Sequence, residues 1–171
     1  MRIVALLAAT ITLQSSQVRA EDFCGQLKNI VKETHSRFSL SRGHAESVIN
    51  TEHAHESGYT TKMSLLGFDY CSIIDDSLGC LGMDSTAGAE PIEASFLSAS
   101  DSLTRCLKAR QSATTGWRVS SGHLAENGTR VQVWTDNNTV DDRGAVQHIS
   151  LRISRQSAPT VFYLTIQFWR Y

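Results

Sequence analysis

The sequence lacks the motifs by which many catalytic and cofactor-binding proteins are recognised. It contains no GxSxG, HExxH, Walker or GxGxxG motif. It also lacks an excess of positive charge, since 16 Lys and Arg stand against 17 Asp and Glu. Generic binding to nucleic acid depends on such an excess, because basic side chains displace the counterions of the phosphates. These absences predict no nucleic-acid partner and no cofactor, and they favour binding over catalysis.

Apolar runs long enough to cross a bilayer are also lacking. The run from Ile3 to Leu13 is about half that length. It follows the basic Arg2, and the small residues Val18 and Ala20 come after it, which is a pattern typical of a signal peptide. We therefore expect residues 1–20 to be a signal peptide. Residues 21–171 should form one domain, periplasmic or secreted, with no membrane span in the mature form.

Four cysteines lie in the predicted mature part, and an oxidising compartment favours their pairing. A two-residue turn at Asp75-Asp76 places Cys71 opposite Cys80. This is a non-hydrogen-bonded position, where a Cα separation of about 4.5 Å suits a disulfide. Zinc binding or a redox role is the alternative, but no further ligands are suitably spaced and the pair is not a CxxC motif. By elimination Cys24 pairs with Cys106, and both bonds should be structural.

Apolar periodicity predicts two helices, each followed by strands. One helix covers residues 21–38, with Phe23, Leu27 and Ile30 on its buried stripe. A second helix begins at Pro91 and carries its own apolar stripe. Two or three strands follow the first helix, and residues 41–57 are only weakly patterned. Four strands follow Trp117, and the first two flank an Asn127-Gly128 turn.

The fold expected is therefore α+β, with two helices packed on a disulfide-bonded antiparallel sheet in the order helix, two or three strands, helix, four strands. Such an order suggests two loosely similar halves, residues 21–84 and 90–171, although no sequence repeat supports this division.

Side-chain alternation along the last four strands predicts a binding surface. One side of the sheet should carry aliphatic residues, including Val131 and Val133 together with Ile149 and Leu151, and should meet the second helix. The other side should carry all three tryptophans. Aromatic residues and arginine dominate binding hot spots. The candidate partner-binding residues are Trp117, His123, Arg130, Trp134, His148, Arg152, Tyr163, Trp169 and Tyr171.

A second interpretation of the same residues is structural. The polar N-terminal part of the chain could cover this side of the sheet, and the tryptophans would then be a second layer of core. Alternation within strands does not distinguish these two arrangements.

Histidines supply a different functional hypothesis. His53 and His55 would point to the same side of an extended chain, and His44 precedes them. Two such imidazoles can begin a transition-metal site. No third ligand follows from the spacing, so we assign no metal ligand. A small periplasmic hydrolase or metal-binding protein that uses these three histidines is the alternative function.

Isolated positions of the chain resemble a loose group of small exported proteobacterial proteins of unknown function. They are Cys24, Leu27, Ile30, Phe38, Arg42-Gly43, Leu66-Gly67, Cys71, Cys80 and Cys106-Leu107. This resemblance implies a periplasmic location and no particular activity. In outline, two helix-plus-sheet halves are also similar to beta-lactamase inhibitor protein, which binds its target through an aromatic-lined sheet.

The function expected from the sequence is that of an exported, non-enzymatic binding protein. Its partner would be another exported protein or an envelope component, which it could inhibit or neutralise.

Overall fold

The N-terminal helix covers residues 22–33 of the computed structural model, which describes residues 22–48, 56–108, 116–120, 129–136, 145–157 and 160–170. Phe23, Leu27 and Ile30 are buried along one side, as the stripe predicts. The helix is shorter than predicted and continues into a single 3-10 turn, η1 (Thr34–Ser36).

The end of this helix has a specific physical cause. Arg37 takes a left-handed conformation with φ of 51°. Its N–H bonds to the carbonyl of Thr34 at 3.1 Å, and that of Phe38 bonds to the carbonyl of Glu33 at 3.1 Å. This pair of bonds is a Schellman motif, which usually has glycine at the left-handed position. The sequence therefore carries no glycine signal at the point where the helix stops.

The strands of the described residues form one eight-stranded sheet, with strand order β1-β2-β3-β4-β8-β7-β6-β5. All of its strand pairs are antiparallel. The strands are β1 (Arg42–Val48), β2 (Glu56–Thr61), β3 (Tyr70–Ile74), β4 (Ser77–Ser85), β5 (Trp117–Ser120), β6 (Arg130–Asp136), β7 (Gln147–Ser157) and β8 (Thr160–Arg170). Helix α2 (Glu90–Lys108) lies between β4 and β5 in the chain. The predicted α+β class is confirmed.

The first group of strands has four members, so the prediction of two or three is wrong. The polar segment that precedes Tyr70 holds both β1 and β2. β1 is an edge strand, and β2 is its neighbour. Strands at the margin of a sheet need little apolar burial on either side, so their sequences show weak alternation.

A helix followed by four strands occurs twice along the chain, and β4 and β8 meet at the centre of the sheet. The division into halves 21–84 and 90–171 stays a prediction. No helix among the described residues is both long and apolar enough to cross a membrane.

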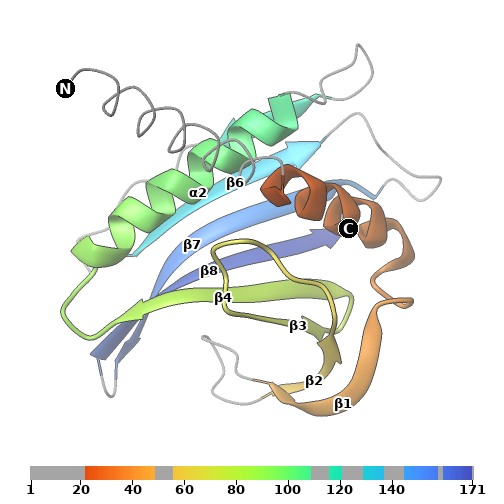
Figure 1. The fold of residues 1–171 in the computed structure, drawn as a ribbon, viewed down its shortest axis with the longest axis horizontal. Coiled ribbons are helices and arrows are strands. Elements are labelled where there is room, and N and C mark those ends of the chain that lie inside the picture. Colours follow the sequence, from red (N-terminus) through yellow and green to blue (C-terminus); the bar gives the residue numbers. More distant parts are fainter. Residues whose placement is uncertain are drawn as a thin grey trace, which may run out of the picture.

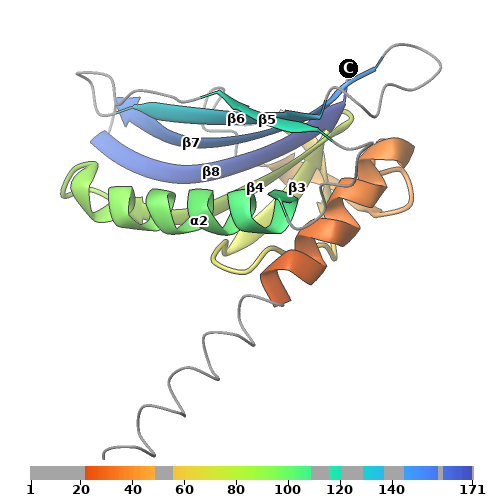
Figure 2. The same ribbon diagram turned by 90° about the horizontal axis from the view of Figure 1, so that it is seen from above.

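Both helices lie on the same side of the sheet (Figures 1 and 2). α2 runs along β6 and β7, and the N-terminal helix lies across the end where β8 finishes. The core fills the space between helices and sheet, and its largest fully buried side chains include Trp134, Phe96, Phe168 and Leu103. We call the sheet side turned away from these helices the open face. It is made by the outward-pointing residues of β3 to β8.

Both predicted disulfides are present. Cys71 lies opposite Cys80 in the β3–β4 hairpin, with the predicted register and a Cα separation of 4.0 Å. Cys24 bonds to Cys106 with a Cα separation of 5.3 Å and joins the N-terminal helix to α2. At the turn, Asp75 has a φ of 52°.

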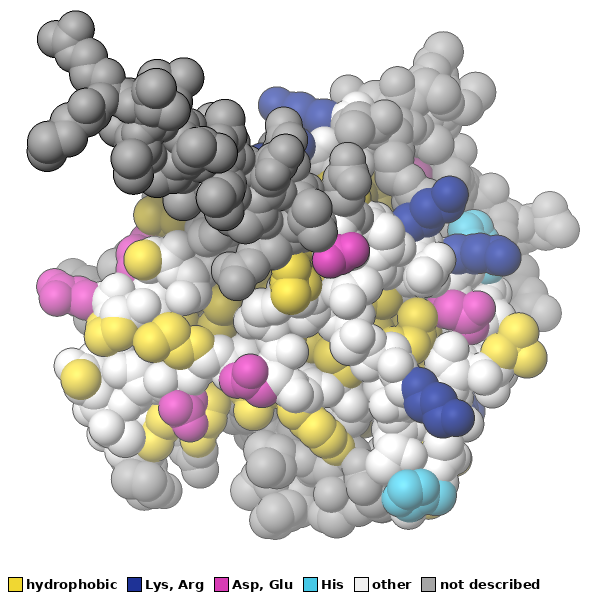
Figure 3. All heavy atoms as spheres, in the orientation of Figure 1, with side chains coloured by type: hydrophobic (Ala, Val, Ile, Leu, Met, Phe, Trp, Pro, Cys, Tyr) yellow, Lys and Arg dark blue, Asp and Glu magenta, His cyan; other side chains and the backbone are white. Residues whose placement is uncertain are grey.

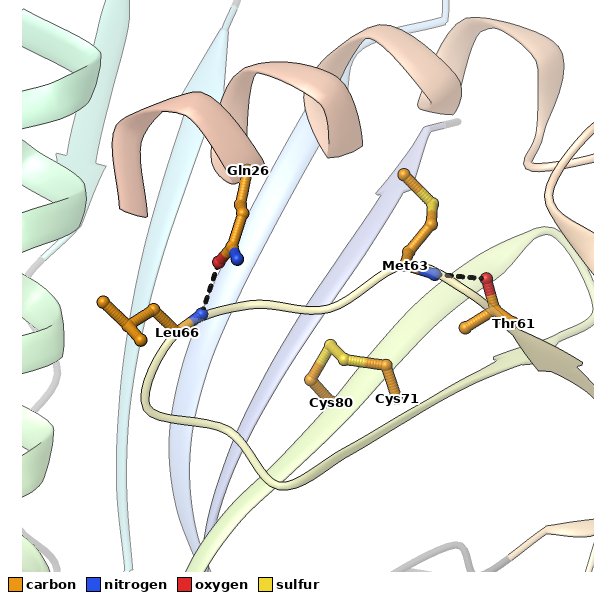
Figure 4. The surroundings of a disulfide bond; sticks show 6 residues. All are labelled: Gln26, Thr61, Met63, Leu66, Cys71 and Cys80. Carbon is orange, nitrogen blue, oxygen red and sulfur yellow. Dashed lines mark hydrogen bonds between the residues drawn. A yellow bond between two sulfur atoms is a disulfide. The ribbon is translucent and has the colours of Figure 1, made fainter. Parts of the chain in front are cut away.

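Three further contacts hold the β3–β4 hairpin and the segment before it in place. The Asp76 carboxylate accepts bonds from Arg37 at 2.8 Å and from Arg42 at 2.9 Å. On the helix side, the Leu66 N–H donates to Gln26 Oε1 at 2.6 Å, so the segment before β3 is tied to the N-terminal helix beside the disulfide (Figure 4).

Candidate binding face of the sheet

The pairing of β6 with β7 decides where each candidate residue lies. Trp134 is opposite Ile149, and Gln132 is opposite Leu151. Directly opposed residues of an antiparallel pair point to the same side of a sheet. Trp134 therefore shares the helix side with the aliphatic residues of β7, whereas Val131 and Val133 point to the open face. The predicted assignment of these two valines to the aliphatic side is wrong.

Trp117 and Trp134 also lie on the helix side, so the prediction that all three tryptophans share one face is wrong. Trp117 is opposite Asp136 and Trp134 is opposite Val119. Their exposed fractions are only 9% and 0%. Trp169, opposite His148, points the other way.

Polar groups of α2 explain why this side of β6 faces inward. Along the strand, Arg130, Gln132 and Trp134 each meet a helix residue, and the helix residues follow in the same order. The Arg130 guanidinium pairs with Glu93 and lies 4.8 Å from the centroid of the Phe96 ring.

The other two contacts are hydrogen bonds. Ser100 Oγ donates to Gln132 Oε1 at 2.8 Å, and Trp134 Nε1–H donates to Thr104 Oγ1 at 3.3 Å. Arg130 and Trp134 were predicted to bind a partner, and here they hold α2 on the sheet.

The open face has a row of four residues that crosses β5 to β8. Arg118 is opposite Thr135, Thr135 is opposite His148, and His148 is opposite Trp169. The His148 and Trp169 rings are stacked, with centroids 5.4 Å apart and planes inclined by 15°. Thr135 Oγ1 lies 3.2 Å from His148 Nδ1. A stacked pair of this kind is a flat contact area with polar atoms at its edge.

Partial burial lowers the pKa of His148 below its usual value, because burial disfavours the charged imidazolium. The stacked ring is therefore mainly neutral at neutral pH. In this form it behaves as an aromatic contact residue with one donor and one acceptor nitrogen.

A second row of the open face runs through Val131, Arg152 and Thr165. Val131 is 37% exposed. Beyond it, Ser154 is opposite Tyr163. The Ser154 residue is only 8% exposed, and its hydroxyl has no hydrogen-bond partner among the described residues. Of the nine candidate residues, the structure thus brings together His148, Arg152, Tyr163 and Trp169.

Sequence reasoning missed Arg118, Thr135 and Val131 as members of this face. The four candidates on β7 and β8 sit on the predicted strands, and only the pairing across β6 identifies their neighbours. His123 and Tyr171 lie outside the described residues.

The histidine hypothesis stays untested, because His53 and His55 also lie outside the described residues. His44 lines a pocket of about 810 Å³ between the N-terminal helix and the β1–β2 pair. Its Nδ1 is 3.3 Å from Thr60 Oγ1. The part of the chain that the structure describes contains no group of three or more His, Cys, Asp or Glu suited to a metal.

Comparison with known proteins returns no relative: no family model, no curated protein and no solved structure matches this chain.

Proposed function

We propose that the protein is an exported, non-enzymatic binding protein that recognises another exported protein or an envelope component through its open face. Inhibition or neutralisation of that partner would follow from the contact itself. The observation that carries the proposal is the His148–Trp169 stack on a sheet side that neither the N-terminal helix nor α2 covers.

The composition of this face supports binding. Trp, Tyr and Arg are enriched where protein partners make their strongest contacts, since each combines a large contact area with a polar group. Trp169, Tyr163 and Arg152 supply all three types within β7 and β8. Exposed or half-exposed Val131 and Val133 extend the apolar contact area on the neighbouring strand.

Export is supported by the two disulfides. Such bonds form and persist in oxidising compartments and are rare where thiols are kept reduced. A periplasmic or secreted location is the finer part of this proposal.

The proposal is tested by capturing partners from an envelope extract on the immobilised mature protein. We expect Trp169→Ala to lose a band that the wild type retains, because the substitution removes one ring of the stacked pair. The control is Leu97→Ala on α2, which removes an apolar side chain of 47% exposure from the helix side.

Thermal unfolding must first show that both variants are folded. Retention of the same band by Trp169→Ala and by the wild type would mean that the open face does not make the contact.

A further inference from the structure

A groove on the helix side of the sheet lies between the N-terminal helix, the segment before β3 and α2. It is lined by Phe23, residues 66–68, Leu164 and one side of α2 from Ala94 to Arg105, and its volume is about 800 Å³. Hydrophobic side chains reach the surface on this side of the molecule (Figure 3). Pockets for small ligands usually have volumes of about 300–1,000 Å³, so this helix-side groove is large enough for one.

The interior of the groove is mostly apolar. Phe23 and Leu164 are buried, with exposed fractions of 6% and 2%, whereas Leu66 is 42% exposed. From α2 the groove receives only alanine and serine side chains before Arg105, so the helix leaves it unfilled. An apolar ligand would therefore cover Leu66 and contact Phe23 without displacing any large side chain of α2.

The wall formed by residues 66–68 has a fixed shape. The Phe68 N–H donates to the Leu65 carbonyl at 3.0 Å, and Gly67 has a φ of 90°. A positive φ at the third residue of such a turn is typical of type II, which favours glycine there. The turn packs directly on β4, because a Cβ added at Gly82 would lie 3.2 Å from the Gly67 carbonyl oxygen. The groove is thus preformed, which lowers the entropic cost of binding.

One end of the groove carries a positive charge. Arg105 is exposed and is the single charged residue among the described residues that line the groove. Its guanidinium donates to Ser102 Oγ at 3.5 Å and forms no ion pair within the described part of the chain. At a rise of about 1.5 Å per residue, Ala94 lies roughly 16 Å from Arg105 along the helix. The arrangement therefore fits a ligand with an anionic head and an apolar tail that follows α2.

An alkyl chain suits the groove better than a peptide. Each residue of a peptide brings an N–H and a carbonyl, which need hydrogen-bond partners where water is displaced. Two hydroxyls along α2 are already bonded, since Ser95 Oγ donates to Met83 Sδ at 3.5 Å and Ser102 Oγ accepts from Arg105. An alkyl chain has no such groups, and its burial is favourable in proportion to the apolar area covered.

We propose that the helix-side groove binds a free long-chain fatty acid, with the carboxylate on Arg105 and the alkyl chain along α2 towards Ala94. The guanidinium pairs with a carboxylate through charge-assisted hydrogen bonds, which are stronger than neutral ones. The groove and the open face lie on opposite sides of the sheet, so this ligand site is separate from the proposed function.

Isothermal titration calorimetry of the protein without residues 1–20 tests the site. The probe is laurate, used below the concentration at which it forms micelles. Dodecyltrimethylammonium, which has the same chain and a cationic head, is the matched ligand control. The wild type should bind laurate, and it should bind the cationic ligand at least about tenfold more weakly, because Arg105 repels that head group.

Two variants of equal charge test the role of the guanidinium. Arg105→Gln should weaken laurate binding by about tenfold, because it removes the charged donor. The control Lys32→Gln changes the net charge equally and should bind laurate within about twofold of the wild type. Lys32 is exposed, and it lies roughly 13 Å from Phe23 along the N-terminal helix.

A third variant fills the groove. Ser98 is exposed on α2 and lines the groove, so Ser98→Trp should abolish laurate binding. Thermal unfolding checks that this variant is folded. If it is not, Ala94→Trp, at another exposed position on the same side of α2, takes its place.

Absence of laurate binding would overturn the inference, as would equal weakening by Arg105→Gln and Lys32→Gln or unchanged affinity in the folded tryptophan variant. Equal binding of laurate and the cationic ligand would show apolar contact without recognition of a carboxylate, which overturns it too. The wild type should also stay in solution beside vesicles of phosphatidylglycerol. Sedimentation with them that Arg105→Gln abolishes would assign the groove to a membrane surface and overturn the free ligand.

Failure of this site is distinguishable from failure of the proposed function. The capture experiment compares the wild type with Trp169→Ala on the open face, and none of the outcomes with laurate changes its result.

Discussion

At the scale of single residues, Gln147 shows how buried polar groups connect the two layers. Its exposed fraction is 2%, and Thr34 beneath it is 1% exposed. Gln147 Nε2 donates to the Val31 carbonyl at 3.0 Å and to Thr34 Oγ1 at 2.5 Å. The side chain therefore satisfies groups at the end of the N-terminal helix, which would otherwise be left in an apolar environment.

Replacing Gln147 by Leu should lower the free energy of unfolding by about 1–3 kcal/mol, because it removes donors from buried acceptors. The matched control is Gln167→Leu on the exposed side of β8, which should change stability by less than about 0.5 kcal/mol. Urea denaturation measures both. Equal effects of the two substitutions would contradict the role given to Gln147.

His148 makes stability depend on pH. Burial lowers its pKa in the folded protein. As the pH falls through the ordinary imidazole value of about 6.5, the unfolded chain takes up a proton that the folded protein does not. Protonation thus favours the unfolded state, and this group's contribution to stability is lost on acidification.

The expected result is a smaller loss of stability in His148→Gln than in the wild type between about pH 7.5 and about pH 5.5. Urea midpoints at the two pH values give the comparison. Parallel losses in both proteins would show that the ring titrates equally in the folded and unfolded states.

At the scale of elements, the contact between α2 and β6 decides the faces of the sheet. Three polar pairs lie along it, from Glu93 with Arg130 to Thr104 with Trp134. Polar side chains on the buried side of a strand are stable only where they have such partners. The helix supplies the partners, so the polar residues of β6 point inward and its valines point outward.

Trp134 and Trp169 should respond differently to truncation. Trp134 is fully buried, and Trp134→Ala should cost about 3–5 kcal/mol. Trp169 lies on the open face and already meets water, so Trp169→Ala should cost about 1–2 kcal/mol. Denaturant unfolding of the two variants tests this order, and a reversed order would mean that the open face is covered. If Trp134→Ala does not fold, Trp134→Phe should still be less stable than Trp169→Phe.

At the scale of the whole molecule, the two disulfides constrain very different lengths of chain. Cys24 and Cys106 are 82 residues apart, whereas Cys71 and Cys80 are nine residues apart. In the chain-entropy description, a disulfide stabilises by restricting the unfolded chain, and the restriction grows with the loop.

Replacing both members of the long bond by serine should therefore cost about 4–5 kcal/mol, against about 2–3 kcal/mol for the hairpin bond. Thermal unfolding of the two double variants measures the difference. The open face should keep its shape in the variant without the long bond, because that bond joins the two helices on the opposite side. A larger loss from the hairpin bond would contradict the order expected from loop entropy.

The elements that the sequence predicted well are those whose signals are local. Residues 71–80 fix their own register, because a two-residue turn leaves one antiparallel pairing for the cysteines. The apolar stripe of α2 and the alternation of β7 and β8 likewise depend only on near neighbours. The sequence signals of β1 and β2 were weak because strands at the margin of a sheet need little apolar burial. The end of the first helix was mispredicted because the left-handed position there is Arg37 and not glycine.

The binding face was only partly predictable, because only some of its residues are placed by signals between near neighbours in the chain. The candidates on β7 and β8 are adjacent through a short connection and lie on one side. Trp134 and Arg130 lie on β6, which is joined to β7 by the longer connection between Asp136 and Gln147. A connection of this length permits either side of β6 to face inward. No local pattern distinguishes these two arrangements.

The sequence by itself determined the disulfide pairing, the α+β class and the alternation of side chains within each strand, since these follow from connectivity and near-neighbour periodicity. Only the tertiary structure decided which side of β6 joins which side of β7. That choice depends on burial of the β6 polar groups against α2, an interaction between residues that are far apart in the chain.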